Sequence, residues 1–471
     1  MVATGIDGLW VDQVYLQSSV GAHHELWPSS DPCSAAAFQR ATGLHLPTAA
    51  DWDDPVFQRW VIWRHTQIAD FLLAEKAAAR AVNPNLVFFN ENSSVDAGRP
   101  TYVGNDPTSY LAYPDMSTGH EVETIADRMD QGETGMKAAT LDQWLAFRTM
   151  IAFARGADLG KPSWILTYGY EPRDSAQLAG LVLAEGANFY ETKGPQMADT
   201  VDTAFRTQLF GWIAAHERAF YSGTSAAEVG VLYSPRTRDL LDTVSGEPYE
   251  VQDSVHFAAY RAVANLLYRT HIPFDVVIDS NTAIFGRYHV LIAPEVQTMS
   301  DATLTALETF TGTVISTGET GHYDEWFNWR EGTVLAGANH LHFDQVTSAI
   351  PTVADTGLFA TDASPAVQFG LRHHETGYTV VIVNTATAPT GNITADLRLR
   401  SQEVVTAVKL STLTPLESVA TFAQATGQSV VHVDLPAGIE TVALLHITTA
   451  PTTTVVTSTS VSQSWLPLIA R

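Results

Sequence analysis

Short apolar runs alternate with longer amphipathic segments over residues 5 to about 195. The longer segments, such as 54–82 and 141–157, carry apolar residues at helical spacing. Strand, helix, strand, helix is typical of a parallel α/β fold. The strand-like runs read DGLWVDQVYL, NLVFFNEN, DMSTGHE, SWILTYGY and GANFYETKG.

Polar or acidic residues close each of these five strand-like runs. They are Asp12, Glu91, Glu121, Tyr170 and Glu191. In a (β/α)8 barrel the functional site lies at the carboxyl ends of the strands, and eight strands are needed for closure. Segment 1–205 is therefore predicted to be the last five units of such a barrel.

The apolar pattern changes after a connecting helix predicted at 206–225. Residues 226–345 contain four short apolar strands, EVGVLYS, PFDVVI, YHVLIAP and GTVISTGE, with helical stretches before the second and the fourth. Ser300 precedes the last helical stretch and is a predicted N-cap. Short strands with crossover helices predict a flavodoxin-like α/β domain.

Apolar and polar residues alternate from about residue 365 onward. This period of two, interrupted by Gly, Pro and Asn, predicts a small antiparallel β-sandwich over 346–450. Residues 451–471 form a Thr/Ser-rich tail, which is typical of an extended linker or stalk.

Composition narrows the class of ligand. The chain has 471 residues, 45% of them hydrophobic, and Asp+Glu total 51 against Lys+Arg 26, for a net charge of −25. Such a surface repels nucleic acid and anionic membranes, so neither is an expected partner. The 11 Trp and 15 Tyr favour a carbohydrate ligand, although many of these rings are equally compatible with a packed core.

The single cysteine, Cys33, excludes a disulfide framework and a CxxC zinc cluster. No apolar run approaches about 18 residues, so no membrane span is predicted. The first ten residues lack the features of a signal peptide. No cofactor and no metal are expected.

Three stretches carry a resemblance to a known family. They are DGLWVD with 31–64, AAEVGVLYSPRTRDLL with YRAVANLLYRTHIPFDVV, and STGETGHYDEWFNWREG. The chain resembles barrel glycoside hydrolases with a β-galactosidase trimerisation domain, of the hypothetical glycosyl hydrolase 6 type, related in layout to family 42 β-galactosidases. This resemblance implies a saccharide substrate and a homo-oligomer formed through the flavodoxin-like domain. Some relatives have paired cysteines in the loop after the first strand. This chain has only Cys33 there, so a metal site formed by those cysteines would be absent.

The resemblance places GLWVD on the fourth barrel strand. Three βα units would precede this strand, so we expect the sequence to be truncated at its start. Either the start of the gene is assigned too far downstream, or the protein is made as a fragment. The signal peptide would be lost with the three units, and the tail resembles those of secreted bacterial proteins, so the full-length form is expected to be extracellular. An open sheet would leave its inward face and edge strands uncovered, which favours self-association and low activity.

Glycoside hydrolysis uses two carboxyl groups across the scissile bond, one as acid and one as nucleophile or base. By resemblance to retaining fucosidase-like barrels, Asp12 is the expected nucleophile and Glu121 the expected acid/base. The structural alternatives are an Asp12 that binds loop amides and a Glu121 that pairs with a helix N-terminus.

A second pair remains open. Glu91 in FFNEN resembles the Asn-Glu pair of clan A hydrolases, which would make Glu191 the nucleophile. Glu171 in YGYEPRD is a lesser candidate.

Candidate substrate contacts are His23, His24 and Trp27 in the loop after the first strand, together with Tyr170 and Glu171. The loop residues are equally compatible with incidental surface composition, and His23 with His24 lacks the carboxylate pattern of a metal site.

The flavodoxin-like segment lacks a cysteine at a strand-to-helix elbow, so it is read as a scaffold and not as an amidotransferase. Its acidic loop GETGHYDEWFNW either reaches a neighbouring active site or caps its own sheet. Two classes of function follow: a glycoside hydrolase acting on O-glycosidic bonds, and a non-catalytic carbohydrate-binding or assembly protein.

Overall fold

The structure is a computed structural model of the whole chain, in which the larger part of the residues is described. The described residues are 5–12, 14–16, 31–49, 51–92, 101, 104–110, 117–121, 139–167, 171–191, 200–241, 255–332, 334–336, 339–340, 359–399, 403–425 and 428–451. Of the predicted tail, only residue 451 is among the described residues.

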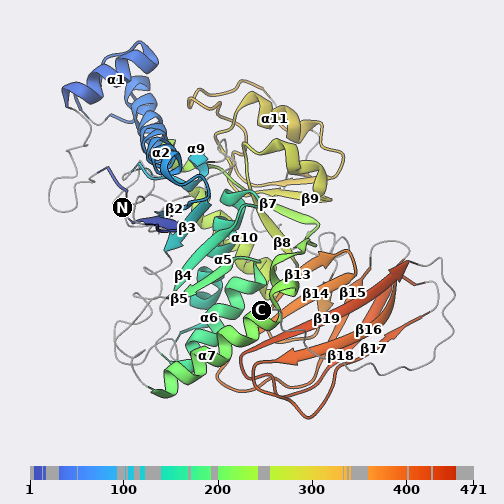
Figure 1. Ribbon diagram of the computed structural model, residues 1–471. Helices are drawn as coiled ribbons and strands as arrows, with labels where there is room; N and C mark the ends of the chain where they lie inside the picture. The colour runs from blue at the N-terminus through green and yellow to red at the C-terminus, as the bar shows by residue number, and fades with distance from the viewer. Residues whose placement is uncertain are drawn as a thin grey trace.

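The N-terminal part is built on a five-stranded sheet (Figure 1). Its strands pair in chain order and all are parallel. This arrangement agrees with the prediction of consecutive βα units, and the predicted mixed α/β fold with several sheets is confirmed. The strands are β1 (Gly8–Val11), β2 (Val87–Asn92), β3 (Ser117–Glu121), β4 (Ser163–Thr167) and β5 (Asn188–Glu191).

Helices with well-defined N-termini connect these strands. Asp31 and Asp54 accept hydrogen bonds from the first backbone N–H groups of α1 and α2, each followed by proline at the first helical position. Thr140 and Gln143 form a reciprocal capping box at α5. The helices are α1 (Pro32–Thr42), α2 (Pro55–Val82), η2 (Pro107–Tyr110), α5 (Leu141–Asp158), α6 (Pro172–Ala184), α7 (Thr200–Ala215) and α8 (Glu217–Tyr221).

A second parallel sheet follows, in the order β11-β10-β9-β7-β8. In chain order this is the 2-1-3-4-5 arrangement of flavodoxin-like sheets. Ser300 accepts a hydrogen bond from the backbone N–H of Thr303, which confirms its predicted N-cap role. The elements are β7 (Val229–Tyr233), α9 (Pro235–Leu240), α10 (Val255–Arg269), β8 (Phe274–Ile278), η6 (Thr282–Arg287), β9 (Val290–Ala293), α11 (Asp301–Glu308), β10 (Thr313–Ser316) and β11 (Asn339–His340).

The C-terminal part consists of two antiparallel sheets, ordered β12-β15-β18-β17 and β16-β19-β14-β13-β6. Along β18 the buried residues are Val431, Val433 and Leu435, as expected for a strand with one face in a sandwich core. The strands are β6 (Thr224–Ser225), β12 (Phe359–Thr361), β13 (Val367–His374), β14 (Gly377–Asn384), β15 (Ile393–Arg398), β16 (Glu403–Thr412), β17 (Thr421–Gln424), β18 (Val430–Leu435) and β19 (Val442–Pro451).

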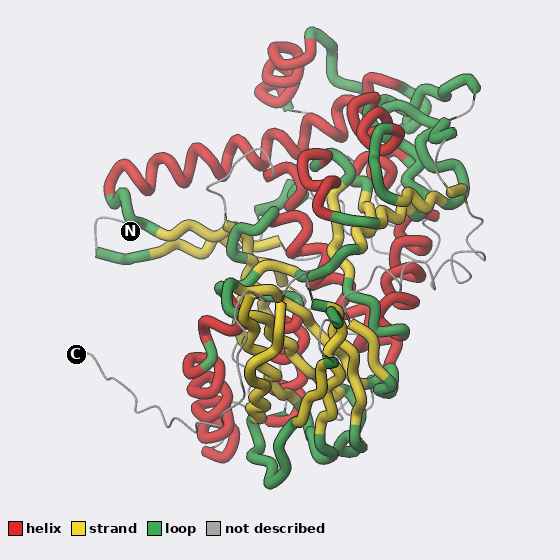
Figure 2. The backbone as a smooth tube through the Cα atoms, turned by 90° about the vertical axis from the view of Figure 1, so that its right-hand side faces the viewer, coloured by secondary structure: helices red, strands yellow, loops and turns green. Residues whose placement is uncertain are grey.

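The three parts share one hydrophobic core. β14 is buried along its whole length because its outer face packs on α6, where Gly180 contacts Val383 and Val442. α5 approaches the edge of β8 so closely that a Cβ on Gly156 would lie 2.5 Å from the carbonyl oxygen of Val276. Figure 2 shows α2 as a long helix extending beside the N-terminal strands. Among helices in the described ranges, none combines the length and hydropathy needed to cross a bilayer.

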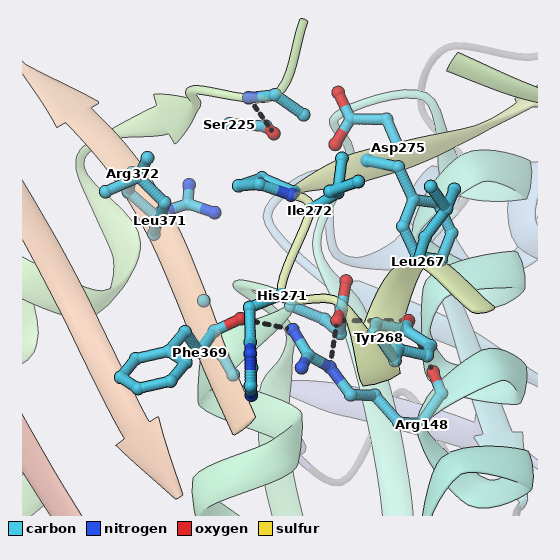
Figure 3. A pocket seen from close by; sticks show the side chains of 16 residues that line it. Arg148, Ser225, Leu267, Tyr268, His271, Ile272, Asp275, Phe369, Leu371 and Arg372 are labelled. Atoms are coloured by element: carbon cyan, nitrogen blue, oxygen red, sulfur yellow. Dashed lines mark hydrogen bonds and ion pairs between the residues drawn. The ribbon is translucent and has the colours of Figure 1, made fainter. Parts of the chain in front are cut away.

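Arg148 of α5 lies where the three parts meet (Figure 3). Its Nε donates to Glu185 at 2.6 Å, and its terminal nitrogens donate to Gln368 Oε1 at 2.7 Å and to the carbonyl of Phe369 at 2.6 Å. The guanidinium also lies 4.2 Å from the ring centre of Tyr268 on α10. One buried cation therefore ties the first sheet's helices to α10 and to the sandwich strand β13.

Replacing Arg148 with methionine should lower the free energy of unfolding by about 3–5 kcal/mol, because Glu185 would lose its ion-pair partner and keep only the hydroxyl of Tyr268. Urea unfolding measures this loss. The matched control is Arg269→Met: Arg269 pairs with Asp142 at 2.5 Å, but the two side chains are 38% and 68% exposed, so the loss should be below about 1 kcal/mol. Equal losses in the two variants would contradict a central role for Arg148.

Candidate functional site

The predicted carboxylates lie at one edge of the β1–β5 sheet. Asp12 directly follows β1, Glu91 is the penultimate residue of β2, and Glu121 and Glu191 end β3 and β5. Parallel pairing aligns these strand ends, with Glu91 opposite Gly119 and Glu121 opposite Leu166. The fold thus brings four sequence-predicted positions to the carboxyl edge of a single sheet.

Four aromatic rings lie on one face of this sheet, which we call the inner face: Trp10, Phe89, Trp164 and Tyr190. The ring centre of Trp10 is 5.7 Å from Phe89 and 5.3 Å from Tyr190, and Phe89 is 5.4 Å from Trp164. Tyr190 is 41% exposed, and the other three rings are partly exposed. The inner face therefore presents aromatic surface to solvent.

The contact between Trp10 and Tyr190 shows that the sheet is strongly curved. These residues belong to β1 and β5, the two edge strands. In a flat sheet the two edges would lie about 19 Å apart, at about 4.8 Å per strand. The curvature lets the rings cover part of one another, which the expectation of an uncovered inward face did not foresee. The inner face is consequently a concave surface.

Glu91 belongs to this concave surface. Its side chain is buried, 4% exposed, and its Oε2 accepts a hydrogen bond from the indole N–H of Trp10. The amide of Asn105 donates to the Glu91 carbonyl at 3.3 Å, which fixes the backbone at this strand end. Glu91 thus orients the Trp10 ring on the inner face.

Glu191 points to the other face of the sheet. Its carboxylate accepts from Arg206 Nε at 2.8 Å and from the hydroxyl of Ser175, and its side chain is fully buried. Arg206 belongs to α7 and Ser175 to α6, so the carboxylate lies between the helices. Glu91 and Glu191 therefore do not face one another, and Glu191 serves as an ion-pair anchor.

Asp12 is exposed and directly follows β1, at the carboxyl edge of the sheet. It lies two residues beyond Trp10, and a two-residue step along a strand returns to the same face. Position 121 lies two residues beyond Gly119, which pairs with Glu91. The register thus assigns positions 12, 91 and 121 to the same face.

The other predicted residues contribute less. Glu171 is the residue before α6 and makes no side-chain capping bond to that helix. His23, His24, Trp27 and Tyr170, predicted as substrate contacts, lie outside the described residues.

Sequence reasoning missed a buried polar cluster between α2, η2 and α9. His65, Asp106 and Asp239 place their ligating atoms within 4.8 Å of one another. Arg238 donates to Asp106 and forms an ion pair with Asp239, both at 2.7 Å. These residues are far apart in the sequence, 132 positions in the case of Asp106 and Arg238, so no local motif marks them.

Arg238 decides what this cluster can hold. Burial opposes its charge, but Asp106 and Asp239 together raise the pKa of Arg238 well above its ordinary value. The guanidinium already supplies the positive charge that a metal ion would bring. The residues therefore fit an internal ion-pair network better than a cation site.

A cavity of about 260 Å³ adjoins the cluster, lined in part by Arg236, Asp279 and Ser280. Burial raises the pKa of Asp279 to about 6, although a hydrogen bond with Ser234 and the charge of Arg236 oppose the rise. Trp326 belongs to the acidic loop GETGHYDEWFNW of the second α/β segment. Its ring centre lies 4.7 Å from the guanidinium carbon of Arg59 on α2 and 5.4 Å from that of Arg236. Trp326 of this loop therefore contacts side chains of both the first and the second α/β part.

No protein-family model and no curated protein matches this sequence. Solved structures do match. An α-L-fucosidase isoenzyme 2 from Paenibacillus thiaminolyticus aligns with a TM-score of 0.61 and 14% identity over 95% of this chain and 78% of that one. A GH42 β-galactosidase from G. stearothermophilus aligns with a TM-score of 0.57 and 11% identity over 88% of this chain and 74% of the other. The β-galactosidase from Bacillus circulans sp. alkalophilus aligns with a TM-score of 0.58 and 12% identity over 84% of this chain and 68% of that one. The chain has a glycoside hydrolase-like fold.

Asp279 gives a testable pH dependence. Its pKa is raised in the folded state, so the folded protein binds more protons than the unfolded chain between about pH 4 and 6, and stability falls as pH rises through that window. The loss is about 3 kcal/mol by pH 7. Asp279→Asn should therefore reduce the stability difference between pH 4 and pH 7, measured by urea unfolding, whereas Asp53→Asn at an exposed position should not. An unchanged difference in Asp279→Asn would show that the native carboxyl is already ionised at pH 4.

Proposed function

We propose that this protein is a glycoside hydrolase that acts on O-glycosidic bonds of oligo- or polysaccharides by a two-carboxylate mechanism. The observation that carries the proposal is the concave inner face, where partly exposed rings of Trp10, Phe89 and Tyr190 lie beside Asp12 and Glu91. Saccharide sites combine apolar ring surface with a few convergent polar groups. The matching structures, two β-galactosidases and a fucosidase, support a galactoside or fucoside substrate.

Asp12 is proposed as the nucleophile and Glu121 as the acid/base. Asp12 is exposed and follows the strand that carries Trp10, so a sugar stacked on that ring would lie within reach of its carboxylate. Glu91, held by Trp10, is assigned to positioning that ring, and the alternative pair of Glu91 with Glu191 is not proposed because the two carboxylates lie on opposite faces of the sheet. Retention requires the two carboxyls about 5–5.5 Å apart, and inversion about 6.5–9.5 Å.

The other parts are proposed to support this unit. The β1–β5 sheet with its helices would correspond to the last five units of a (β/α)8 barrel, and the β7–β11 sheet to the trimerisation-type domain. Homo-oligomerisation through the latter, and an extracellular location of the full-length form, are part of the same proposal.

In the full-length form, Asp12→Asn and Glu121→Gln should each lower turnover of aryl galactosides or fucosides about 100-fold or more, because each removes a carboxyl of the mechanism and preserves side-chain volume. The matched control is Asp7→Asn, an exposed aspartate directly before the same strand, which should keep wild-type turnover. Steady-state rates and circular dichroism of the four proteins provide the measurement.

Two results would overturn parts of this proposal. Wild-type rates in both Asp12→Asn and Glu121→Gln would reject the assigned pair. Saccharide binding to the wild-type chain without hydrolysis of any substrate would favour the non-catalytic carbohydrate-binding function.

A further inference from the structure

A groove of about 560 Å³ runs between the three parts of the molecule, on the side opposite the carboxyl edge. It follows the free edge of β8, and it is bounded by the end of α5, by the residues preceding β4 and β5, and by β13. Six charged side chains line it. Four are basic and two acidic: Arg155, Lys161, Arg287, Arg372, Glu185 and Asp275.

Arg372 is the most buried of the basic residues. It is 6% exposed, and its guanidinium lies directly over Gly186, where any Cβ would collide with it. One terminal nitrogen donates to the carbonyl of Gly223, but Nε is buried without a hydrogen-bond partner among the described residues. Figure 3 shows the side chain projecting from β13 toward Ser225 and Ile272. The Nε–H of Arg372 is thus a buried donor for which the described residues supply no acceptor.

A second positive charge, that of Arg155, acts on Arg372. Burial first, and then the nearby charge of Arg155, lower the pKa of Arg372 to about 10. Arg155 uses one terminal nitrogen to donate to the Lys161 carbonyl at 2.9 Å and to Ser163 Oγ at 3.1 Å, bonds that bring no neutralising charge. In the same groove the Nδ2 of Asn281 is also buried without a partner among described residues.

The two acidic residues of the groove are already engaged. Glu185 is paired with Arg148 at 2.6 Å. Asp275 accepts from the hydroxyl of Tyr288 at 3.1 Å and lies 3.8 Å from Arg287. The charges of Asp275 and Glu185 also act on Arg372 and oppose the lowering of its pKa, but each of these carboxylates pairs with another arginine. The groove therefore has four basic side chains against two acidic ones, in a chain whose net charge is −25.

We propose that this groove is a binding site for an oxyanion, a sulfate or phosphate group, held by the guanidinium groups of Arg155 and Arg372 with Lys161 and Asn281 beside them. Arginine presents donors in a fork that matches tetrahedral oxyanions, and such charge-assisted bonds are roughly twice as strong as neutral ones. The groove borders the amino ends of β4 and β5, one strand length away from Asp12 and Glu91. Its ligand is therefore distinct from the substrate of the proposed hydrolase, and neither proposal depends on the other.

Titration calorimetry of the full chain at constant ionic strength tests this site. Wild type should bind inorganic sulfate or phosphate saturably, with a Kd of about 1 mM or tighter, and chloride should not compete at equal ionic strength. Arg155→Gln should weaken binding about tenfold or more, as should Arg372→Gln. The matched control is Arg40→Gln, an exposed arginine on α1, which should bind as wild type does. Galactose 6-sulfate serves as a second probe, and its binding would show that the anion can be carried on a saccharide.

Arg372 also holds the Gly223 carbonyl, so Arg155→Gln and Lys161→Gln carry the test if Arg372→Gln does not fold. Absence of saturable binding of both inorganic anions to wild type would overturn the proposal. Wild-type affinity in both Arg155→Gln and Lys161→Gln would overturn it equally.

Discussion

The two edge strands of the β1–β5 sheet meet through the rings of Trp10 and Tyr190, although three strands lie between them. That contact requires strong curvature, and the curvature produces the concave inner face. The outer face carries the opposite chemistry: Phe189 stacks on Phe210 of α7, and Glu191 pairs with Arg206. One sheet thus separates a face that packs on helices from a face that carries partly exposed aromatic rings.

The remaining parts hold the curved sheet from outside. α6 packs on β14 of the sandwich, and α5 packs on β8 of the second parallel sheet. The helices that cover the first sheet therefore also cover one face or edge of the other two parts. Buried charges complete these junctions, with Arg148 on one side and Arg238 on the other. Replacing such a charge would leave its buried partner unpaired, which is strongly destabilising.

Local patterns predicted the elements well. Period-two and helical spacings located the five parallel strands and the alternating strands of the sandwich, and Ser300 marked a helix start that the structure confirms. The face of the sheet on which each strand residue lies was harder to predict. Glu91 and Glu191 look alike in sequence, since each closely follows aromatic strand residues, yet Glu91 contacts Trp10 on the inner face and Glu191 contacts helices.

That difference arises from pairing between distant strands, which no local pattern records. For the same reason the cluster around Arg238 and the groove shared by Arg155 and Arg372 could not be predicted, because each brings together residues more than a hundred positions apart. Candidate carboxylates were therefore predictable from the sequence, whereas their surroundings were not.

The central claim is that a saccharide is cleaved on the concave inner face. The most direct measurement is a crystal structure of Asp12→Asn with a bound aryl galactoside or fucoside. We expect a sugar ring stacked on Trp10 or Tyr190, with side chains 12 and 121 flanking the glycosidic oxygen less than about 10 Å apart. A sugar bound at another surface, or side chains 12 and 121 farther apart than that, would contradict the claim.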